Sequence, residues 1–455
     1  MGMPYAKQLL PREKVFRDPI HNYIYVRHQV ILDLINTPEF QRLRRIKQLG
    51  TSSFTFHGAE HSRFTHSLGV YEIARRICNN FQRNFPHQKN CDDGLWDDDA
   101  ERLVTLCAAL LHDIGHGAYS HTFEHIFGTD HEKITRDIIT NSKTTVNQVL
   151  KRVAPDFPER VASVIDKTYP NPQVVQIISS QCDADRMDYL LRDSYSTGTS
   201  YGNFDLTRIL RLMRPYHDGI CFDMRGMHTI EDYIIGRMQM YLQVYFHPVS
   251  RSMEVILNKL LLRARDIYRN GKFPPHLTPY LLLPFFDSDN NQNAQFDLNA
   301  YLELDDGVLN TYFIHWMHSK DQVLSDLAHR FLDRIPFKSV KYERESALTT
   351  INDLKQIVKN NGFKEVEYYT GIDNSFNHPY DSYDTKKQVH NGPIMLMQLD
   401  HSLVELSKVS ELVNVVTDKT VSDDRFFFPR EFVKERNTPA QREFQEYIQN
   451  DEIIK

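Results

Sequence analysis

Apolar residues recur at helical spacing from about residue 37 to residue 275, and this pattern restricts the possible folds more than any other feature of the sequence. The segment TPEFQRLRRIKQLG is the clearest case, because Thr37 can cap a helix at its start and Gly50 can end it. Similar periods occur over residues 66–83, 98–113, 131–140, 158–168, 183–194 and 228–247. We therefore predict one mainly α-helical domain over residues 1–285.

The sequence pattern changes after residue 285. Residues 286–299, FDSDNNQNAQFDLN, are polar and rich in Asn, which is typical of an exposed loop near a domain boundary. Beyond them, the segments 363–369 and 392–399 alternate or run apolar in the manner of strands. We therefore predict a smaller mixed α+β region over residues 286–455. Within the helical domain, the Asp-Gly pair in RPYHDGICFDM, residues 214–224, predicts a small hairpin.

Composition excludes several classes of protein. The formal charge of -6 over 455 residues argues against a protein that coats nucleic acid, so any phosphate binding must be local. The five cysteines are widely spaced without a C-x-x-C pair, which indicates neither a disulfide framework nor a zinc ribbon and fits a reducing compartment. No apolar run reaches the length of a signal peptide or a membrane span. We expect a cytoplasmic protein with no membrane association.

One stretch, HDIGHGAYSHTFEHIFGTDHE over residues 112–132, contains five histidines and four carboxylates. On a helix, the i,i+4 spacing would place His112 and His116 on one face, and the nearby glycines let the chain leave that helix tightly. The adjacent His and Asp suit a metal site of mixed nitrogen and oxygen ligands, for which Mn, Fe, Zn, Co and Ni are all acceptable. Two residues cannot complete such a site.

Further ligands must come from other segments. His66 lies at the start of an amphipathic helix in SRFTHSLGVYEIARR, and Asp183, Asp185 and Asp188 cluster at another helix start in QCDADRMDYLLRD. A hydrogen-bonded core residue or a helix cap explains any one of these side chains equally well. Spacing alone therefore leaves the ligand set open.

Five longer phrases lie between residues 14 and 194: KVFRDPIHNYI, TPEFQRLRRIKQLG, HSRFTHSLGV, HDIGHGAYSHTFE and DADRMDYLLRDS. Together they resemble the deoxynucleoside triphosphate (dNTP) triphosphohydrolases among the HD-domain metal phosphohydrolases, a branch that includes the vertebrate SAM-and-HD-domain dNTPase and its bacterial relatives. A weaker resemblance continues to about residue 270. The resemblance as a whole implies a helical HD-domain core in which His66, His112, Asp113 and Asp185 bind one divalent transition metal ion.

The resemblance also implies a reaction in which water attacks the α-phosphorus of a dNTP and releases a deoxynucleoside and intact triphosphate, with Mg²⁺ on the nucleotide phosphates. In that reaction His121 orients or deprotonates the water, while His116 and His131 donate to phosphate or to the leaving oxygen. Glu132 is a candidate to orient one of these rings, and Asp183 is a candidate to hold a neighbouring group. The implied substrate-binding residues are Gln48, Arg63, Arg186, Tyr189, Asp193, Arg237 and Tyr245.

The N-terminal segment is implied to contribute to a regulatory nucleotide site at a subunit interface of a homotetramer. Lys14, Gln41 and Arg44 are the candidate effector-binding residues, and the expected effector is dGTP or GTP. Asn36 stands where some relatives use an Asp to read guanine. A neutral amide cannot accept from both guanine donors as a carboxylate does, so the specificity for guanine stays open.

Two alternatives remain at this point. Other HD proteins hydrolyse cyclic nucleotides, nucleoside monophosphates or alarmones, and the same metal ligands suit those substrates. A sensor of nucleotides or nucleic acid with a structural metal is the second alternative. Two features argue against the sensor: the chain has a net negative charge, and it has more histidines in this stretch than a metal site with four ligands needs.

Overall fold

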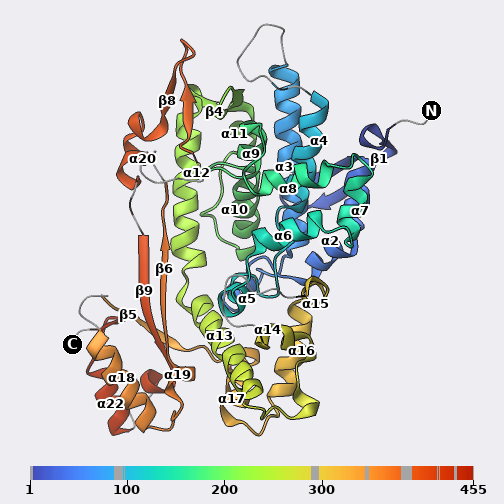
Figure 1. Cartoon of the computed structure of the whole chain (residues 1–455). Helices are drawn as coiled ribbons and strands as arrows, with labels where there is room; N and C mark the ends of the chain where they lie inside the picture. Colours follow the sequence, from blue (N-terminus) through green and yellow to red (C-terminus); the bar gives the residue numbers. More distant parts are fainter. Residues whose placement is uncertain are drawn as a thin grey trace.

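The computed structural model describes residues 4–86, 96, 98–287, 297–343, 348–380, 392–417, 419, 421–434 and 438–453. Within these ranges the chain forms 22 α-helices and three small sheets (Figure 1). The predicted fold class is confirmed, because the first part of the chain is helical and the C-terminal part mixes helices with strands. Each described helix is too short or too polar to cross a membrane.

The N-terminal part begins with an antiparallel pair, β1 (Leu9–Asp18) and β2 (Asn22–His28), that leads into α1 (Gln29–Ile35) and α2 (Pro38–Arg42). The helices that follow are α3 (Arg63–Asn84), α4 (Asp98–Leu111), α5 (His121–Phe127), α6 (His131–Thr140), α7 (Thr145–Lys151), α8 (Phe157–Ile165), α9 (Pro172–Ile178), α10 (Ala184–Thr197), α11 (Leu206–Leu212), α12 (Met227–Met240) and α13 (Pro248–Arg269). α3 packs against both α4 and α10, which places it at the centre of the helical domain.

The predicted helix over residues 37–50 is shorter than expected. Its start is as predicted, because the Thr37 hydroxyl accepts a hydrogen bond from the backbone N–H of Phe40. The α-helix ends at Arg42 and continues only as a 3₁₀ turn, Leu43–Arg45. The next residues hydrogen-bond elsewhere instead: the Lys47 N–H donates to Asp306, and the Gln48 N–H donates to the carbonyl of His61. These tertiary hydrogen bonds replace those that would continue the helix.

The helices of the C-terminal part are α14 (Leu283–Asp287), α15 (Leu298–Leu302), α16 (Asp306–Trp316), α17 (Gln322–Leu332), α18 (Leu348–Asn360), α19 (Val366–Tyr369), α20 (Glu411–Val416), α21 (Glu431–Lys434) and α22 (Pro439–Gln445). The remaining strands are β3 (Met213–Tyr216), β4 (Gly219–Asp223), β5 (Lys338–Lys341), β6 (Gly371–Asn377), β7 (Met395–Met397), β8 (Leu403–Glu405), β9 (Val421–Phe428), β10 (Ile448–Gln449) and β11 (Glu452–Ile453). One sheet has the order β10-β11-β5-β9-β6 and another the order β3-β4-β7-β8. The β5 and β6 strands contact α13, and β9 pairs with both of these strands (Figure 1).

The predictions for the strands have mixed outcomes. The hairpin over residues 214–224 is confirmed as β3 and β4, and the segment 392–399 contains β7, which extends the sheet of that hairpin. The strand predicted at residues 363–369 is wrong, because the segment contains the helix α19. Val366 and Tyr369 are both buried at a spacing of three residues, which one face of a helical turn satisfies.

Two apolar cores hold the molecule together. The larger core contains the helical domain and also Trp316 and Phe331, which lie beyond residue 285. The second core is smaller and includes Leu354 and Phe444 of the C-terminal part. The domain boundary near residue 285 stays a prediction, because the larger core has members on both sides of it.

Candidate functional site

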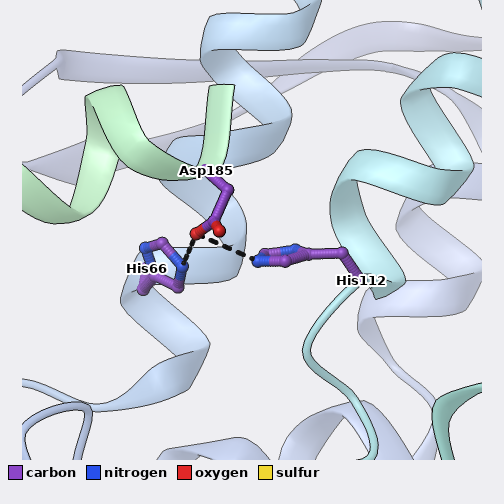
Figure 2. A group of neighbouring side chains, drawn as sticks. All are labelled: His66, His112 and Asp185. Carbon is purple, nitrogen blue, oxygen red and sulfur yellow. Dashed lines mark ion pairs between the residues drawn. The ribbon is translucent and has the colours of Figure 1, made fainter. Parts of the chain in front are cut away.

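Three side chains that are distant in sequence meet at the centre of the helical domain. His66 comes from α3, His112 directly follows α4, and Asp185 lies in the first turn of α10. Asp185 Oδ1 is 3.0 Å from Nε2 of His66 and 3.5 Å from Nε2 of His112. Figure 2 shows the carboxylate of Asp185 between the two imidazole rings. The three donor atoms are close enough to bind one ion.

Asp113, the fourth predicted ligand, borders this group. Its Oδ1 lies 3.3 Å from Nε2 of His112, and its Oδ2 lies 3.8 Å from Nε2 of His66. Asp113 also receives a hydrogen bond from Nη1 of Arg63. The fold therefore brings together all four residues that the resemblance implies as metal ligands.

His112 and His116 do not share a helix face, contrary to the expectation from their spacing. α4 ends at Leu111, and the chain turns through the tight hydrogen bond from the His116 N–H to the Asp113 carbonyl. Gly115 permits this turn to pack closely, since a Cβ there would lie 2.3 Å from the carbonyl oxygen of His131. His112 consequently joins His66 and Asp185, whereas His116 joins Asp113 and His131.

The two metal-side imidazoles are arranged as ligands. His66 Nδ1 lies 2.9 Å from Asp188 Oδ2, and His112 Nδ1 lies 3.0 Å from the carbonyl oxygen of Ala109. Their Nε2 atoms are buried and have no hydrogen-bond partner among the described residues. An imidazole whose Nδ1 donates to an oxygen presents a lone pair on Nε2, which is the form that binds a metal ion. Two such rings with two carboxylates fit a divalent transition metal ion.

A second layer of buried charge holds His66 in place. The carboxylate of Asp188 contacts Nδ1 of His66, Nε2 of His21 at 2.7 Å and Nε of Arg192 at 2.8 Å. Arg192 in turn donates to Asp18 at the end of β1. Gly69 on α3 makes room for this pair, since a Cβ there would lie 1.9 Å from Asp188 Oδ1. Asp188, one of three candidate ligands in its segment, thus orients a ligand instead.

The buried charges of the cluster shift one another's pKa values in opposite directions. Burial opposes the charged form of His66, but the adjacent carboxylates of Asp185 and Asp188 raise the pKa of His66 to about 10. Burial likewise disfavours the Asp185 carboxylate, yet the two histidines lower the pKa of Asp185 well below its usual range. The carboxylates thus favour a cation at this position, which a proton or a metal ion can provide.

A second group of imidazoles lies beside Asp113. The rings of His116 and His131 stack with centroids 3.9 Å apart. Glu124 orients His131, since its Oε1 is 2.8 Å from Nδ1 of that ring. Glu132, which was predicted to orient a ring, instead has its carboxylate 3.5 Å from Nζ of Lys167. His121 begins α5, but its side chain lies outside the described residues.

Asp113, Asp185, His116 and His131 line a cavity of about 450 Å³. Of the predicted substrate-binding residues, the ones that line it are Gln48, Arg63, Tyr189, Asp193 and Tyr245. Tyr241 and Glu254 also line it and are not among the predicted site residues. Tyr241 lies four residues before Tyr245, so helical spacing could have indicated it.

The other two predicted substrate-binding residues, Arg186 and Arg237, lie outside this lining, as does the catalytic candidate Asp183. Asp183 caps α10, because its carboxylate accepts from the backbone N–H groups of Arg186 and Ser180, both at 2.7 Å. Nε of Arg186 lies 3.4 Å from the same carboxylate. Nη1 of Arg237 is 3.5 Å from the carbonyl oxygen of Pro379. These contacts give Asp183 a structural role at the helix start.

The predicted effector residues do not all come together. Gln41 and Arg44 do, since Nε of Arg44 donates to Oε1 of Gln41 at 2.8 Å and its guanidinium lies over the ring of Phe64. Asn36 is exposed at the end of α1, and Lys14 is exposed on β1. All four positions are exposed or partly exposed in the single chain.

Comparison with known proteins agrees with this geometry. A family model described as "HD domain" matches residues 63–193, and one described as "HD associated region" matches residues 204–270. The uncharacterized protein YwfO of Bacillus subtilis is 47% identical over 95% of both chains. The SAMHD1 homologue of Dictyostelium discoideum, named as a dNTP triphosphohydrolase, is 31% identical over 69% of this chain and 64% of that protein. The crystal structure of a phosphohydrolase from Bacteroides thetaiotaomicron is similar with a TM-score of 0.77 and 27% identity, covering 92% of this chain and 100% of that chain.

Proposed function

The chain belongs to the HD-domain family, and from this premise we propose that it hydrolyses dNTPs to deoxynucleosides and inorganic triphosphate. The observation that supports this most is the cluster of His66, His112, Asp113 and Asp185, of which Asp113 and Asp185 line a cavity of about 450 Å³. That volume suits a nucleotide-sized ligand. The names of the SAMHD1 relatives support the choice of dNTPs over other phosphoesters.

His66, His112, Asp113 and Asp185 would hold the metal ion, and their surroundings keep the donor atoms in place. A bound divalent ion supplies Lewis-acid polarisation of a phosphate oxygen and a more acidic water. The protein's own part begins with Arg63, which donates to both Asp113 and Ser120 at the cavity wall. Its guanidinium provides positive charge where the phosphates of the substrate would lie.

His131 is suited to donate a proton in this proposal. Burial lowers the pKa of His131, but the hydrogen bond with Glu124 outweighs burial and raises it above its usual value. The protonated ring can then stabilise charge on a phosphate oxygen or protonate the leaving 5′ oxygen. His121 remains assigned to the attacking water by the resemblance alone.

The aromatic end of the cavity would receive the sugar and base. The rings of Tyr189 and Tyr245 meet edge to face with centroids 6.3 Å apart, and the Tyr245 hydroxyl donates to Asp193 at 2.8 Å. A sugar packed against a fixed tyrosine ring leaves little room for a 2′-hydroxyl. We propose that this packing selects deoxyribonucleotides, and that Gln48 contributes to the same end of the cavity.

Regulation and assembly form part of the proposal. Lys14, Asn36, Gln41 and Arg44 lie at the surface or partly exposed, where a second subunit would complete a nucleotide site. A homotetramer and a dGTP or GTP effector, which the motif resemblance implies, complete this part of the proposal.

The test is to incubate the purified full chain with all four dNTPs together and separate the products by chromatography. Mn²⁺ or Mg²⁺ is added, and the metal content of the protein is measured in the same samples. We expect deoxynucleosides and intact triphosphate, which together identify attack at the α-phosphorus. The mixture is needed because one nucleotide would activate hydrolysis of another. Metal-loaded protein that leaves every dNTP intact would contradict the proposal.

A further inference from the structure

A second cavity, of about 640 Å³, lies on the far side of α3 from the metal ligands. Its walls come from the N-terminal segment and β2, the C-terminal half of α3, α4 and α8. Arg75 lines it, whereas His66 on the same helix joins the metal cluster. His66 and Arg75 are nine residues apart, which corresponds to about 14 Å along an α-helix. At this separation, the two side chains lie on opposite faces of the helix. The two cavities share no lining residue in the described part of the chain.

Positive charge is concentrated in this second cavity. The cationic lining residues are Lys7, Arg27, Arg75, Arg102 and Arg160. Glu13 is the single carboxylate in the described lining. The chain as a whole carries a formal charge of -6, so this group runs against the overall composition. Arg75 is paired with Glu72, but the other cations repel one another, and a bound anion would offset that cost. The lining therefore favours a ligand that carries several negative charges.

Some of these guanidinium groups are held in place while keeping donors for a ligand. Arg75 forms a bidentate ion pair with Glu72, in which Nε donates to Oε2 at 2.8 Å and Nη2 donates to Oε1 at 2.7 Å. This pair fixes the plane of the Arg75 guanidinium. Nη2 of Arg102 donates to Asn79 Oδ1 at 2.7 Å. Nη1 of Arg102 is buried and has no hydrogen-bond partner among the described residues. A buried donor without an acceptor is costly, so an anion bound close to this guanidinium would offset that cost.

The rest of the lining is largely apolar. Leu103, Leu106 and Phe157 are almost fully buried, and the guanidinium of Arg160 lies over the ring of Phe157 with its centre 5.8 Å away. An apolar wall opposite fixed guanidinium groups suits a ligand with a planar or apolar body and anionic groups. The volume lies within the range of small-molecule sites.

We propose that this cavity binds a small organic polyphosphate of nucleotide size, at a site separate from the catalytic cavity. The guanidinium groups of Arg27, Arg75, Arg102 and Arg160 face the phosphates, and Leu106 and Phe157 contact the organic part. The predicted effector residues Lys14, Asn36, Gln41 and Arg44 are absent from the described lining, so this site differs from that regulatory surface.

The test measures binding of labelled ATP and of inorganic triphosphate to the full-length, metal-loaded protein by equilibrium dialysis. The variant carries Arg27→Ala with Arg160→Ala. The control carries Arg12→Ala with Arg83→Ala, which removes the same charge from two exposed arginines outside the cavity. We expect saturable ATP binding at one site per chain that weakens at least tenfold in the variant and less than twofold in the control. Triphosphate should bind the same site more weakly than ATP.

Equal ATP binding by the wild type and the Arg27→Ala/Arg160→Ala variant would overturn the proposal, as would the absence of saturable binding at millimolar ATP. Triphosphate that binds as tightly as ATP would overturn the part that assigns an organic body to the apolar wall. Arg27→Glu is a second variant in case the double variant is unstable, because Arg27 is exposed on β2. Binding is read without turnover, so a failure to hydrolyse dNTPs leaves this result interpretable.

Discussion

The region around His66 and the second core around Phe444 are stabilised by different kinds of contact. Around His66, buried charges from separate segments meet: Asp188 contacts His21, His66 and Arg192, and Arg192 contacts Asp18. Around Phe444, the contacts are apolar, with ring centroids 4.6 Å from Phe428 and 5.1 Å from Phe432. An apolar core tolerates changes that preserve volume, whereas a buried charge network fails when one partner is lost.

This difference shows that atoms must be placed more precisely around His66 than around Phe444. Metal ligands must hold their donor atoms within a fraction of an ångström, and a network of directional hydrogen bonds fixes ring orientation in a way that apolar packing does not. The second core has only to exclude water from its members. Four substitutions test the contrast.

The largest effect is expected from Asp113→Ala. Removal of a metal ligand should lower metal content and turnover together, with turnover falling more than about a hundredfold, because loss of a supporting residue alone already costs about 10- to 100-fold. Metal content by elemental analysis and dNTP hydrolysis are the measurements. His121→Ala is the matched control, which should keep the metal and lose turnover. Wild-type hydrolysis by the His121 variant would contradict the role assigned to that residue.

Asp188→Asn should weaken both the metal site and the fold. The change leaves Arg192 buried with a weakened partner, which is expected to cost about 3–5 kcal/mol in the free energy of unfolding and about 10- to 100-fold in metal affinity. Denaturant unfolding and metal titration measure the two effects. Asp166→Asn is the control, because its pair with Arg136 is partly exposed and should contribute less than about 1 kcal/mol. Unchanged metal affinity in the Asp188 variant would show that the network does not position His66.

Phe444→Ala should destabilise the second core without changing the metal site. The side chain is fully buried, so its removal is expected to cost about 3–5 kcal/mol in the free energy of unfolding. Phe444→Leu keeps most of the volume and should cost clearly less. Unfolding by denaturant and metal content of the folded protein are measured together. Loss of metal in the Phe444→Ala variant would show that the two regions are coupled.

The smallest effect concerns Asp306, a buried carboxyl whose hydrogen bonds come from the backbone N–H groups of Lys47 and Tyr119. Burial, only partly offset by these hydrogen bonds, raises the pKa of Asp306 to about 6 from an ordinary value of 3.8. Because the folded pKa lies above the unfolded one, the folded protein binds the proton more tightly. Protonated Asp306 therefore contributes its full amount to the free energy of unfolding below about pH 4. This contribution decreases as the pH rises through 6, by up to about 3 kcal/mol.

Asp306→Asn removes this titration. We expect the difference in the free energy of unfolding between wild type and variant to change between pH 4 and pH 7, with wild type losing stability relative to the variant as the pH rises. The measurement is denaturant unfolding at several pH values. A difference that stays constant across this range would contradict the raised pKa.

Features that depend on neighbouring residues could be predicted from the sequence, whereas features that depend on distant residues could not. Caps and turns depend on neighbouring residues, so the Thr37 cap and the hairpin at residues 214–224 were predictable. Motif resemblance selected His66, His112, Asp113 and Asp185, which the fold brings together. The end of α2 at Arg42 was not predictable, because residues that follow hydrogen-bond to a distant partner, Asp306.

The sequence by itself determined which residues are candidates for the chemistry, because His, Asp and Arg side chains have fixed donor and acceptor properties. It also determined most helices, because helical periodicity is local. Only the tertiary structure decided that Glu124, rather than Glu132, lies beside His131, and that Asp188 supports His66. Those choices depend on which segments pack together, and the packing arises from apolar burial spread over the whole larger core. Local sequence patterns do not predict which segments pack together. The positions of the supporting residues were therefore known only from the tertiary structure.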